Sequence, residues 1–210
     1  ISLFVAYQKL GVAESRLGRE ESAMRNLQKA VEYGRAVAEN TPADSPVRSN
    51  LVFTLRRLGA SLNSLGRWTE AESAFREAVA SGQAGYIVKP DPDWATELSR
   101  AHMDYSSGLA TVGRYRDGVA QADAAVVAAR AAAEAAKTAS SQINLATALR
   151  VQALAGARIG DTMQWITPMK ESLAIAEATL SLTPDDANAQ EAVALTSRTL
   201  GSAYASINRW

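Results

Sequence analysis

The stretch LRRLGASLNSLGRWTEAESAFREA, residues 55–78, decides the fold, because its pattern of small and apolar residues recurs along the chain. Its central mark is an apolar residue followed by glycine and a polar residue, here Leu65-Gly66-Arg67, and this mark returns every 47 or 48 residues. The other marks are Leu17-Gly18-Arg19, Val112-Gly113-Arg114, Ile159-Gly160-Asp161 and, with asparagine in place of glycine, Ile207-Asn208-Arg209. A fixed period of this kind is typical of repeat proteins, in which each unit buries its apolar face against its neighbours.

Two helix-length runs lie between consecutive marks, and the alternation of apolar and polar residues that a strand requires is absent. In the second run of the first unit, for example, Leu27 follows Ala23 by four residues and precedes Ala30 and Val31 by three and four, which places them on one helical face. The sequence therefore predicts a single all-α domain, a solenoid of about four and a half helical hairpins with nine helices. Its expected units are residues 1–42, 43–90, 91–138, 139–184 and a partial unit 185–210.

Proline at 168 interrupts the second helical run of the fourth unit. A proline inside a helix removes one hydrogen-bond donor and clashes with the preceding turn, so the helix must either kink or begin there. We expect the late start, with Thr167 as the N-cap and Pro168 as the first helical residue.

Composition excludes several classes of function. The 22 basic and 22 acidic side chains balance, so no overall field favours nucleic acid or anionic lipid, and no apolar run is long enough for membrane insertion. Cysteine is absent, which excludes disulfides and thiolate metal sites but leaves the compartment open. We favour a cytoplasmic location, with an extracytoplasmic one expected if the parent is a membrane-anchored kinase.

The repeated positions resemble the tetratricopeptide repeat, most completely in the second unit. There the signature residues are Leu55, Leu58-Gly59, Leu62, Ala71, Phe75 and Ala78. The resemblance extends over the whole chain and implies a right-handed superhelix. The period, longer than the usual 34 residues, is similar to that of kinesin-light-chain-type repeats and of repeat regions attached to bacterial signalling proteins such as serine/threonine kinases.

This resemblance implies a protein-binding scaffold that holds a peptide or protein segment in a concave groove. The alternative is a regulatory or oligomerisation segment of a larger bacterial signalling enzyme, and we expect the chain to be part of a longer protein. In that case the catalytic domain lies elsewhere in the parent.

Catalytic chemistry finds little support in the residues. The single histidine, His102, occupies a place that is apolar in other units, which favours a packed side chain over a catalytic one. Asp91 and Asp93 stand in a proline-rich turn where aspartate commonly caps a helix. We therefore predict no catalytic residue, no metal site and no cofactor.

The first helix of each hairpin lines the concave face in tetratricopeptide arrays, so the resemblance places the binding residues there. The candidates are Gln8, Lys9, Phe53, Arg56, Arg57, Asn63, Arg100, Met103, Arg150, Arg158 and Arg198. Three of these arginines, Arg56, Arg150 and Arg198, share one place in their units and should form a column that favours acidic peptides, because arginine binds carboxylates bidentately. The alternative is a charge-balanced face whose arginines pair with glutamates of the second helices.

The final helix lacks a partner within these residues. We expect it to expose the apolar side chains of Val193, Leu200, Tyr204 and Ile207, and such a stripe could support self-association.

Overall fold

The computed structural model describes residues 2–160 and 162–207, and this part of the chain contains nine helices and no strand. Residues 162–164 and Ile207 are described in their backbone only, and residues 208 and 209 of the last sequence mark lie outside the described residues. The helices are α1 (Leu3–Arg16), α2 (Glu20–Ala38), α3 (Pro46–Ser64), α4 (Trp68–Val88), α5 (Pro92–Thr111), α6 (Tyr115–Ala136), α7 (Ala139–Gly156), α8 (Thr162–Leu182) and α9 (Ala187–Ile207).

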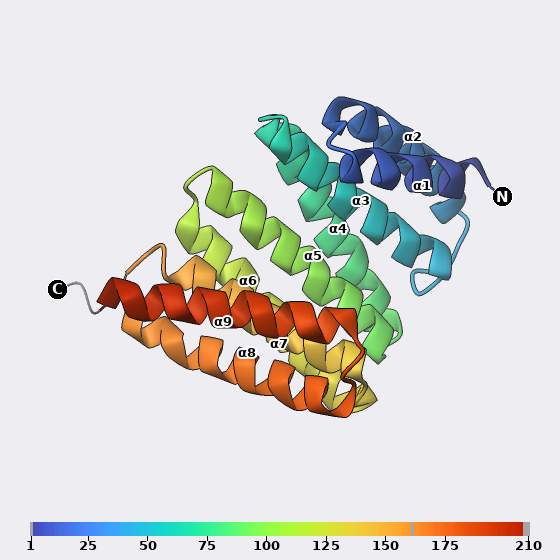
Figure 1. The fold of residues 1–210 in the computed structure, drawn as a ribbon. Helices are drawn as coiled ribbons and strands as arrows, with labels where there is room; N and C mark the ends of the chain where they lie inside the picture. The colour runs from blue at the N-terminus through green and yellow to red at the C-terminus, as the bar shows by residue number, and fades with distance from the viewer. Residues whose placement is uncertain (1, 161, 208–210) are drawn as a thin grey trace.

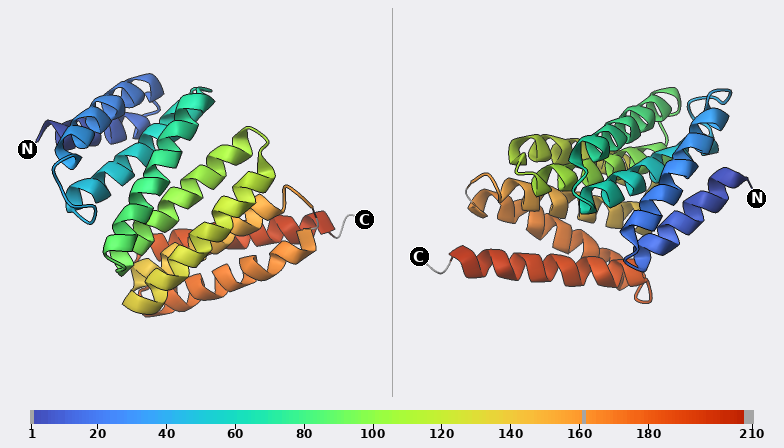
Figure 2. Two further views of the ribbon diagram at one scale, coloured as in Figure 1. Left: turned by 180° about the vertical axis from the view of Figure 1, so that it is seen from behind. Right: turned by 90° about the horizontal axis from the view of Figure 1, so that it is seen from above.

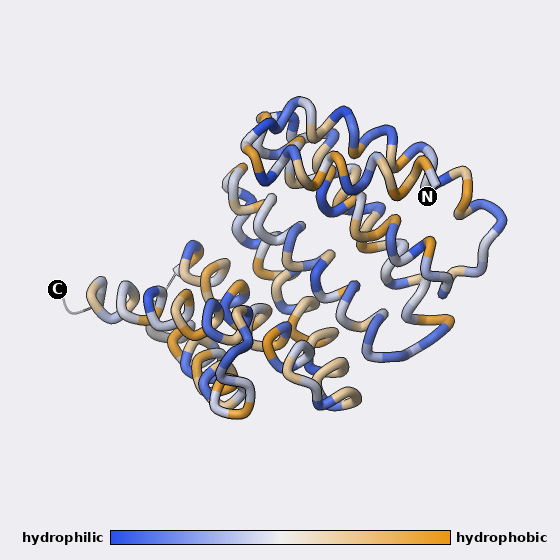
Figure 3. Tube along the Cα trace, turned by 45° about the vertical axis from the view of Figure 1, so that its right-hand side comes forward, coloured by the Kyte–Doolittle hydropathy of each residue, from blue (hydrophilic) through white to orange (hydrophobic). Residues whose placement is uncertain are grey.

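The helices form an α-solenoid in which consecutive helices pack as hairpins (Figure 1). Four hairpins, α1/α2, α3/α4, α5/α6 and α7/α8, stack in order, and α9 packs on α7 and α8 at the end of the stack (Figure 2). The predicted all-α solenoid is confirmed. Hydrophobic and hydrophilic residues are interleaved along the helices, as each helix has neighbours on one side and solvent on another (Figure 3).

The two layers of the solenoid are packed differently. The odd-numbered helices contact one another along the stack, from α1 to α9, whereas the even-numbered helices have no such contacts within the described residues. The even layer is instead bridged by long side chains, as in the ion pairs Arg35–Glu77, Glu72–Arg114 and Arg130–Glu171. The odd-numbered helices therefore form the inner, more tightly spaced side of the curve.

The glycine marks close the first three hairpins. Gly18, Gly66 and Gly113 have φ between 72° and 77°, the left-handed conformation that commonly ends a helix and that glycine adopts without strain. Gly160 does not adopt it, because α7 already ends at Gly156. The fourth turn is therefore built differently from the others, although its sequence mark is similar.

Small residues set the spacing between helices. A Cβ at Gly59 on α3 would lie 2.6 Å from the ring of Phe75, and one at Gly108 on α5 would lie 2.8 Å from the same ring. Phe75 on α4 is 1% exposed, so its ring fills the space that these two glycines leave. The absence of a side chain at both positions is what allows α3, α4 and α5 to meet around one aromatic residue.

The expected late start of the eighth helix is wrong. Helix α8 begins at Thr162 and contains Pro168 in its interior. Two large apolar residues lie shortly before the proline: Trp165 packs against Gly156, and Ile166 is 6% exposed. Burial of these side chains stabilises the first turns of α8 by an amount that offsets the donor lost at Pro168.

Within the described residues, no helix is both long and apolar enough to span a bilayer.

Candidate protein-binding groove

A groove of about 480 Å³ lies on the face formed by the odd-numbered helices. Its walls come from α3, α5 and α7 and from the start of α9, so residues from four repeat units meet in it. The lining residues include Arg56, Arg100, Met103, Asp104, Ser107, Ser140, Ile143, Asn144, Thr147, Arg150, Val151, Asp186 and Asn188. Ten of these thirteen residues are polar or charged, and Met103, Ile143 and Val151 supply the apolar part of the lining.

The structure brings four of the predicted concave-face residues together in this groove: Arg56, Arg100, Met103 and Arg150. The other seven are on or near the odd-numbered helices but do not line it. They are Gln8, Lys9, Phe53, Arg57, Asn63, Arg158 and Arg198.

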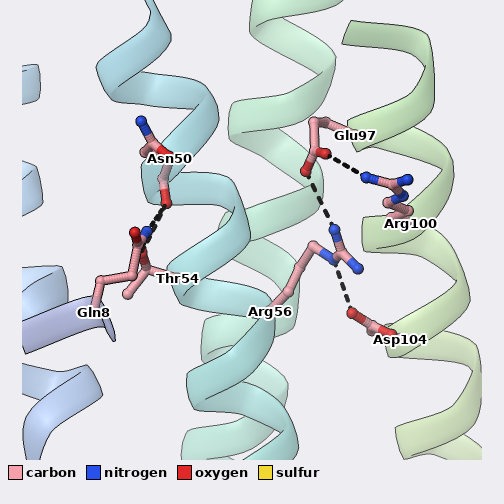
Figure 4. A network of polar contacts seen from close by, with 7 residues as sticks. All are labelled: Gln8, Asn50, Thr54, Arg56, Glu97, Arg100 and Asp104. Carbon is pink, nitrogen blue, oxygen red and sulfur yellow. Dashed lines mark hydrogen bonds and ion pairs between the residues drawn. The ribbon is translucent and has the colours of Figure 1, made fainter. Parts of the chain in front are cut away.

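Two of these seven connect one repeat to the next. The amide of Gln8, which is buried, donates to the carbonyl oxygen of Asn50 at 3.1 Å and to Oγ1 of Thr54 at 2.7 Å, so it joins α1 to α3 (Figure 4). Asn63 accepts a hydrogen bond of 2.8 Å from the hydroxyl of Thr111 and so joins α3 to α5. Both side chains are used in holding the stack together.

Arg56 is also committed to the stack, which corrects the expectation of an open arginine column. Its Nε donates to Asp104 at 2.8 Å and its Nη1 to Glu97 at 3.2 Å, both on α5 (Figure 4). Glu97 also pairs with Arg100 at 3.1 Å. The Arg56 side chain is only 11% exposed, and its partners lie on a first helix, not on the second helices that the alternative interpretation required. Arg56, Glu97, Arg100 and Asp104 thus form a charge-balanced cluster, the α3–α5 cluster.

Arg150 differs from Arg56 although it shares its place in the repeat. It is half-buried on α7 and forms no ion pair or hydrogen bond with a side chain that the structure describes. Burial lowers the pKa of Arg150, the nearby charge of Glu191 opposes this, and the like charge of Arg198 adds to it. Even so, the guanidinium remains protonated at physiological pH, so it places a positive charge at the edge of the groove.

Asn144 is a groove residue that the sequence analysis missed. It is 5% exposed on α7, and its Nδ2 has no hydrogen-bond partner in the part of the chain that the structure describes. A signal existed, since Asn50, Glu97 and Asn144 occupy the same place in three consecutive units and all are polar. A polar residue repeated at one helical position indicates a role that apolar packing does not explain.

Comparison with known proteins agrees with this architecture. Residues 54–84 match the tetratricopeptide repeat family, and they lie within α3 and α4. The second hairpin is thus similar to a tetratricopeptide repeat. The resemblance predicted from the sequence is thereby confirmed, and a tetratricopeptide-type fold indicates a protein–protein interaction scaffold. A comparison of the sequence with curated proteins gave no match.

Two solved structures align with this chain over nearly its whole length. A putative kinesin light chain with nearly identical TPR-like repeats from Podosopora anserina is 14% identical, with 98% of this chain and 96% of that one covered and a TM-score of 0.49. MamA from Desulfovibrio magneticus RS-1, residues 41 to the end, is 14% identical, with 99% and 94% covered and a TM-score of 0.38.

The described residues were also searched for a metal site. No group of three histidine, cysteine, aspartate or glutamate side chains is placed there to hold a metal ion. His102 is half-buried between α5 and α6, with Nδ1 at 2.8 Å from Oε1 of Gln121, and burial lowers its pKa. The ring of this histidine is thus held against Gln121 within the hairpin.

Proposed function

We propose that the chain binds a peptide or protein segment in the groove of its odd-numbered helices and carries out no chemistry of its own. The observation that carries this proposal is the groove itself, about 480 Å³ in volume and lined by residues of four repeat units. A segment bound there would contact units that are far apart in the sequence. Its binding would therefore depend on the stack as a whole, as the concave faces of repeat arrays do.

A matched pair of tryptophan variants tests the proposal. Ser107→Trp places a large side chain on an exposed position of α5 that lines the groove, and Val127→Trp does the same on α6, where Val127 is 72% exposed. Proteins captured from the source lysate by the native chain are purified and titrated against both variants by calorimetry. Loss of binding in Ser107→Trp alone supports the groove. Equal affinity of the two variants for every captured protein refutes it.

A second candidate function is assembly, as a regulatory or oligomerising segment of a larger bacterial signalling enzyme such as a serine/threonine kinase. It is supported by α9, which packs on α7 and α8 and leaves Tyr204 39% exposed. Leu200 is half-buried against α8 and belongs to the core, so it contributes less to an outer stripe than the sequence predicted. If Tyr204→Ser does not change the sedimentation coefficient over a wide concentration range, self-association through α9 is wrong.

A further inference from the structure

Helix α1 exposes two leucines whose counterparts are buried in the second and third units. Leu3 is 56% exposed and Leu10 is 48% exposed. The residues that share their places are buried: Leu51, Leu98 and Leu145 for Leu3, and Leu58 and Tyr105 for Leu10. Ala6 lies between the two leucines and is exposed as well. This face of α1 therefore has the composition of a helix–helix interface, and it is open within the described residues.

The buried counterparts pack on small residues of the preceding second helix. A Cβ at Gly34 on α2 would lie 3.1 Å from Cδ1 of Leu51, and one at Gly82 on α4 would lie 3.5 Å from Cδ1 of Leu98. Leu145 clusters in the same way with alanines of α6. A helix that covers the leucines of α1 in this manner must present a face of small residues.

Helix α9 presents such a face at the other end of the stack. Ala194, Ser197, Gly201 and Ala205 follow one another at three or four residues along α9, and all four are exposed. A Cβ at Gly201 would meet nothing within 4 Å, whereas one at Gly59, which shares its place, would lie 2.6 Å from an aromatic ring of α4. The small-residue face of α9 therefore leaves room for bulky side chains of another helix.

The charges beside the two faces are complementary. Arg16 at the end of α1 and Arg19 just after it are exposed, and α1 has no exposed acidic side chain. Asp185, just before α9, and Glu191, in its second turn, are exposed acids, and Glu191 also acts on Arg150 in its own copy. An antiparallel pair of α1 and α9 brings the basic end of one helix to the acidic end of the other. Two copies of α1 would instead bring like charges together.

We propose that the chain associates head to tail, with the leucine face of α1 in one copy docked antiparallel on the small-residue face of α9 in a second copy. The two helices lie at opposite ends of the stack (Figure 1), so each contact leaves one free face at each end and further copies can add. A single helix pair buries less area than a standard interface, so we expect a dissociation constant of roughly tens to hundreds of micromolar. This inference rests on the assembly candidate, since it names the surface that α9 meets.

Sedimentation equilibrium of the full chain, between about 10 and 500 µM, tests the association. The average mass of the native protein should rise continuously with concentration and pass that of a dimer. Leu10→Glu on α1 and Gly201→Glu on α9 should each weaken association by about tenfold or more, because each buries an unpaired charge in the contact. Val127→Glu is the matched control, since Val127 on α6 is 72% exposed and belongs to neither face. All three positions are exposed, and circular dichroism spectra verify that each variant is folded.

A mixture of the two interface variants identifies the faces. Leu10→Glu keeps its α9 face and Gly201→Glu keeps its α1 face, so one intact contact remains between them. At a concentration where each variant alone is monomeric, a one-to-one mixture should form dimers and nothing larger.

Several results would overturn the inference. These are a native chain that stays monomeric over the whole range, association of Gly201→Glu alone, a mixture that stays monomeric, or an equal loss in Val127→Glu. If Leu10→Glu associates as the native chain does while Gly201→Glu does not, α9 meets another surface, so the inference fails and the assembly candidate stands. Binding in the groove is decided separately by Ser107→Trp, because Ser107 lies on neither face.

Discussion

Replacement of Arg56 by methionine separates a structural arginine from a binding one. Methionine keeps most of the apolar stem and removes two charged hydrogen bonds, to Asp104 at 2.8 Å and to Glu97 at 3.2 Å. Breaking a buried ion pair costs about 3–5 kcal/mol, and a hydrogen bond to a charged group contributes about 1.5–3 kcal/mol. The Asp104 side chain is 35% exposed, so water can replace its hydrogen bond to Arg56, and Glu97 still has its ion pair with Arg100. Both effects reduce the destabilisation. We expect Arg56→Met to lower the free energy of unfolding by about 2–4 kcal/mol.

The assay is urea unfolding followed by both circular dichroism and tryptophan fluorescence, because a repeat array can unfold in more than one step. A loss of that size corresponds to a fall in melting temperature of about 4–16 °C for a domain of this length. Arg25→Met is the matched control, since Arg25 pairs with Glu21 at 3.8 Å and their side chains are 62% and 77% exposed. It should change stability by less than about 0.5 kcal/mol. If both variants lose the same small amount, Arg56 is not structural and is free to bind a partner.

Packing and titration give further predictions. Gly59→Ala should destabilise the fold by about 1–3 kcal/mol, because the new methyl would lie 2.6 Å from the ring of Phe75. Gly201→Ala on α9, where a Cβ meets nothing within 4 Å, should stabilise it by about 0.5–1 kcal/mol through helix propensity, and thermal unfolding of the pair measures both. The lowered pKa of His102 means that the unfolded chain binds more protons below the ordinary value of 6.5. The free energy of unfolding should therefore fall as the pH drops through that value, and it should fall less in the His102→Leu variant. Urea unfolding measured between pH 5 and 8 checks this, and a steeper fall in the variant would contradict it.

The solenoid was predictable from the sequence because its determinants are local and repeated. The glycine marks place the turns, and the small residues such as Gly59 reserve the space that Phe75 fills. Pro168 was misread because the burial of Trp165 and Ile166, which supports the first turns of α8, depends on tertiary contacts that the sequence does not display.

The groove was only partly predictable, because the position of a residue in its repeat does not determine which side chain it pairs with. Arg56 and Arg150 occupy the same place in their units, yet Arg56 forms two ion pairs with α5 and Arg150 forms none with a described side chain. The difference comes from the following first helix, which has Glu97 in one case and Ala192 in the other. Asn144 went unnoticed for a related reason. That its Nδ2 is buried without a hydrogen-bond partner among the described residues is visible only in the folded structure.

The unequal spacing of the two helical layers has a mechanical consequence. The odd-numbered helices touch and form a stiff inner spine, whereas the even-numbered helices are held to one another by long side chains such as those of Arg35 and Glu77. Ion pairs between exposed side chains weaken as ionic strength rises. The stack should therefore bend most easily by opening and closing its outer layer, and salt should soften it. The curvature of the groove, and with it the reach of its binding residues, would then be adjustable by the medium without any helix unfolding.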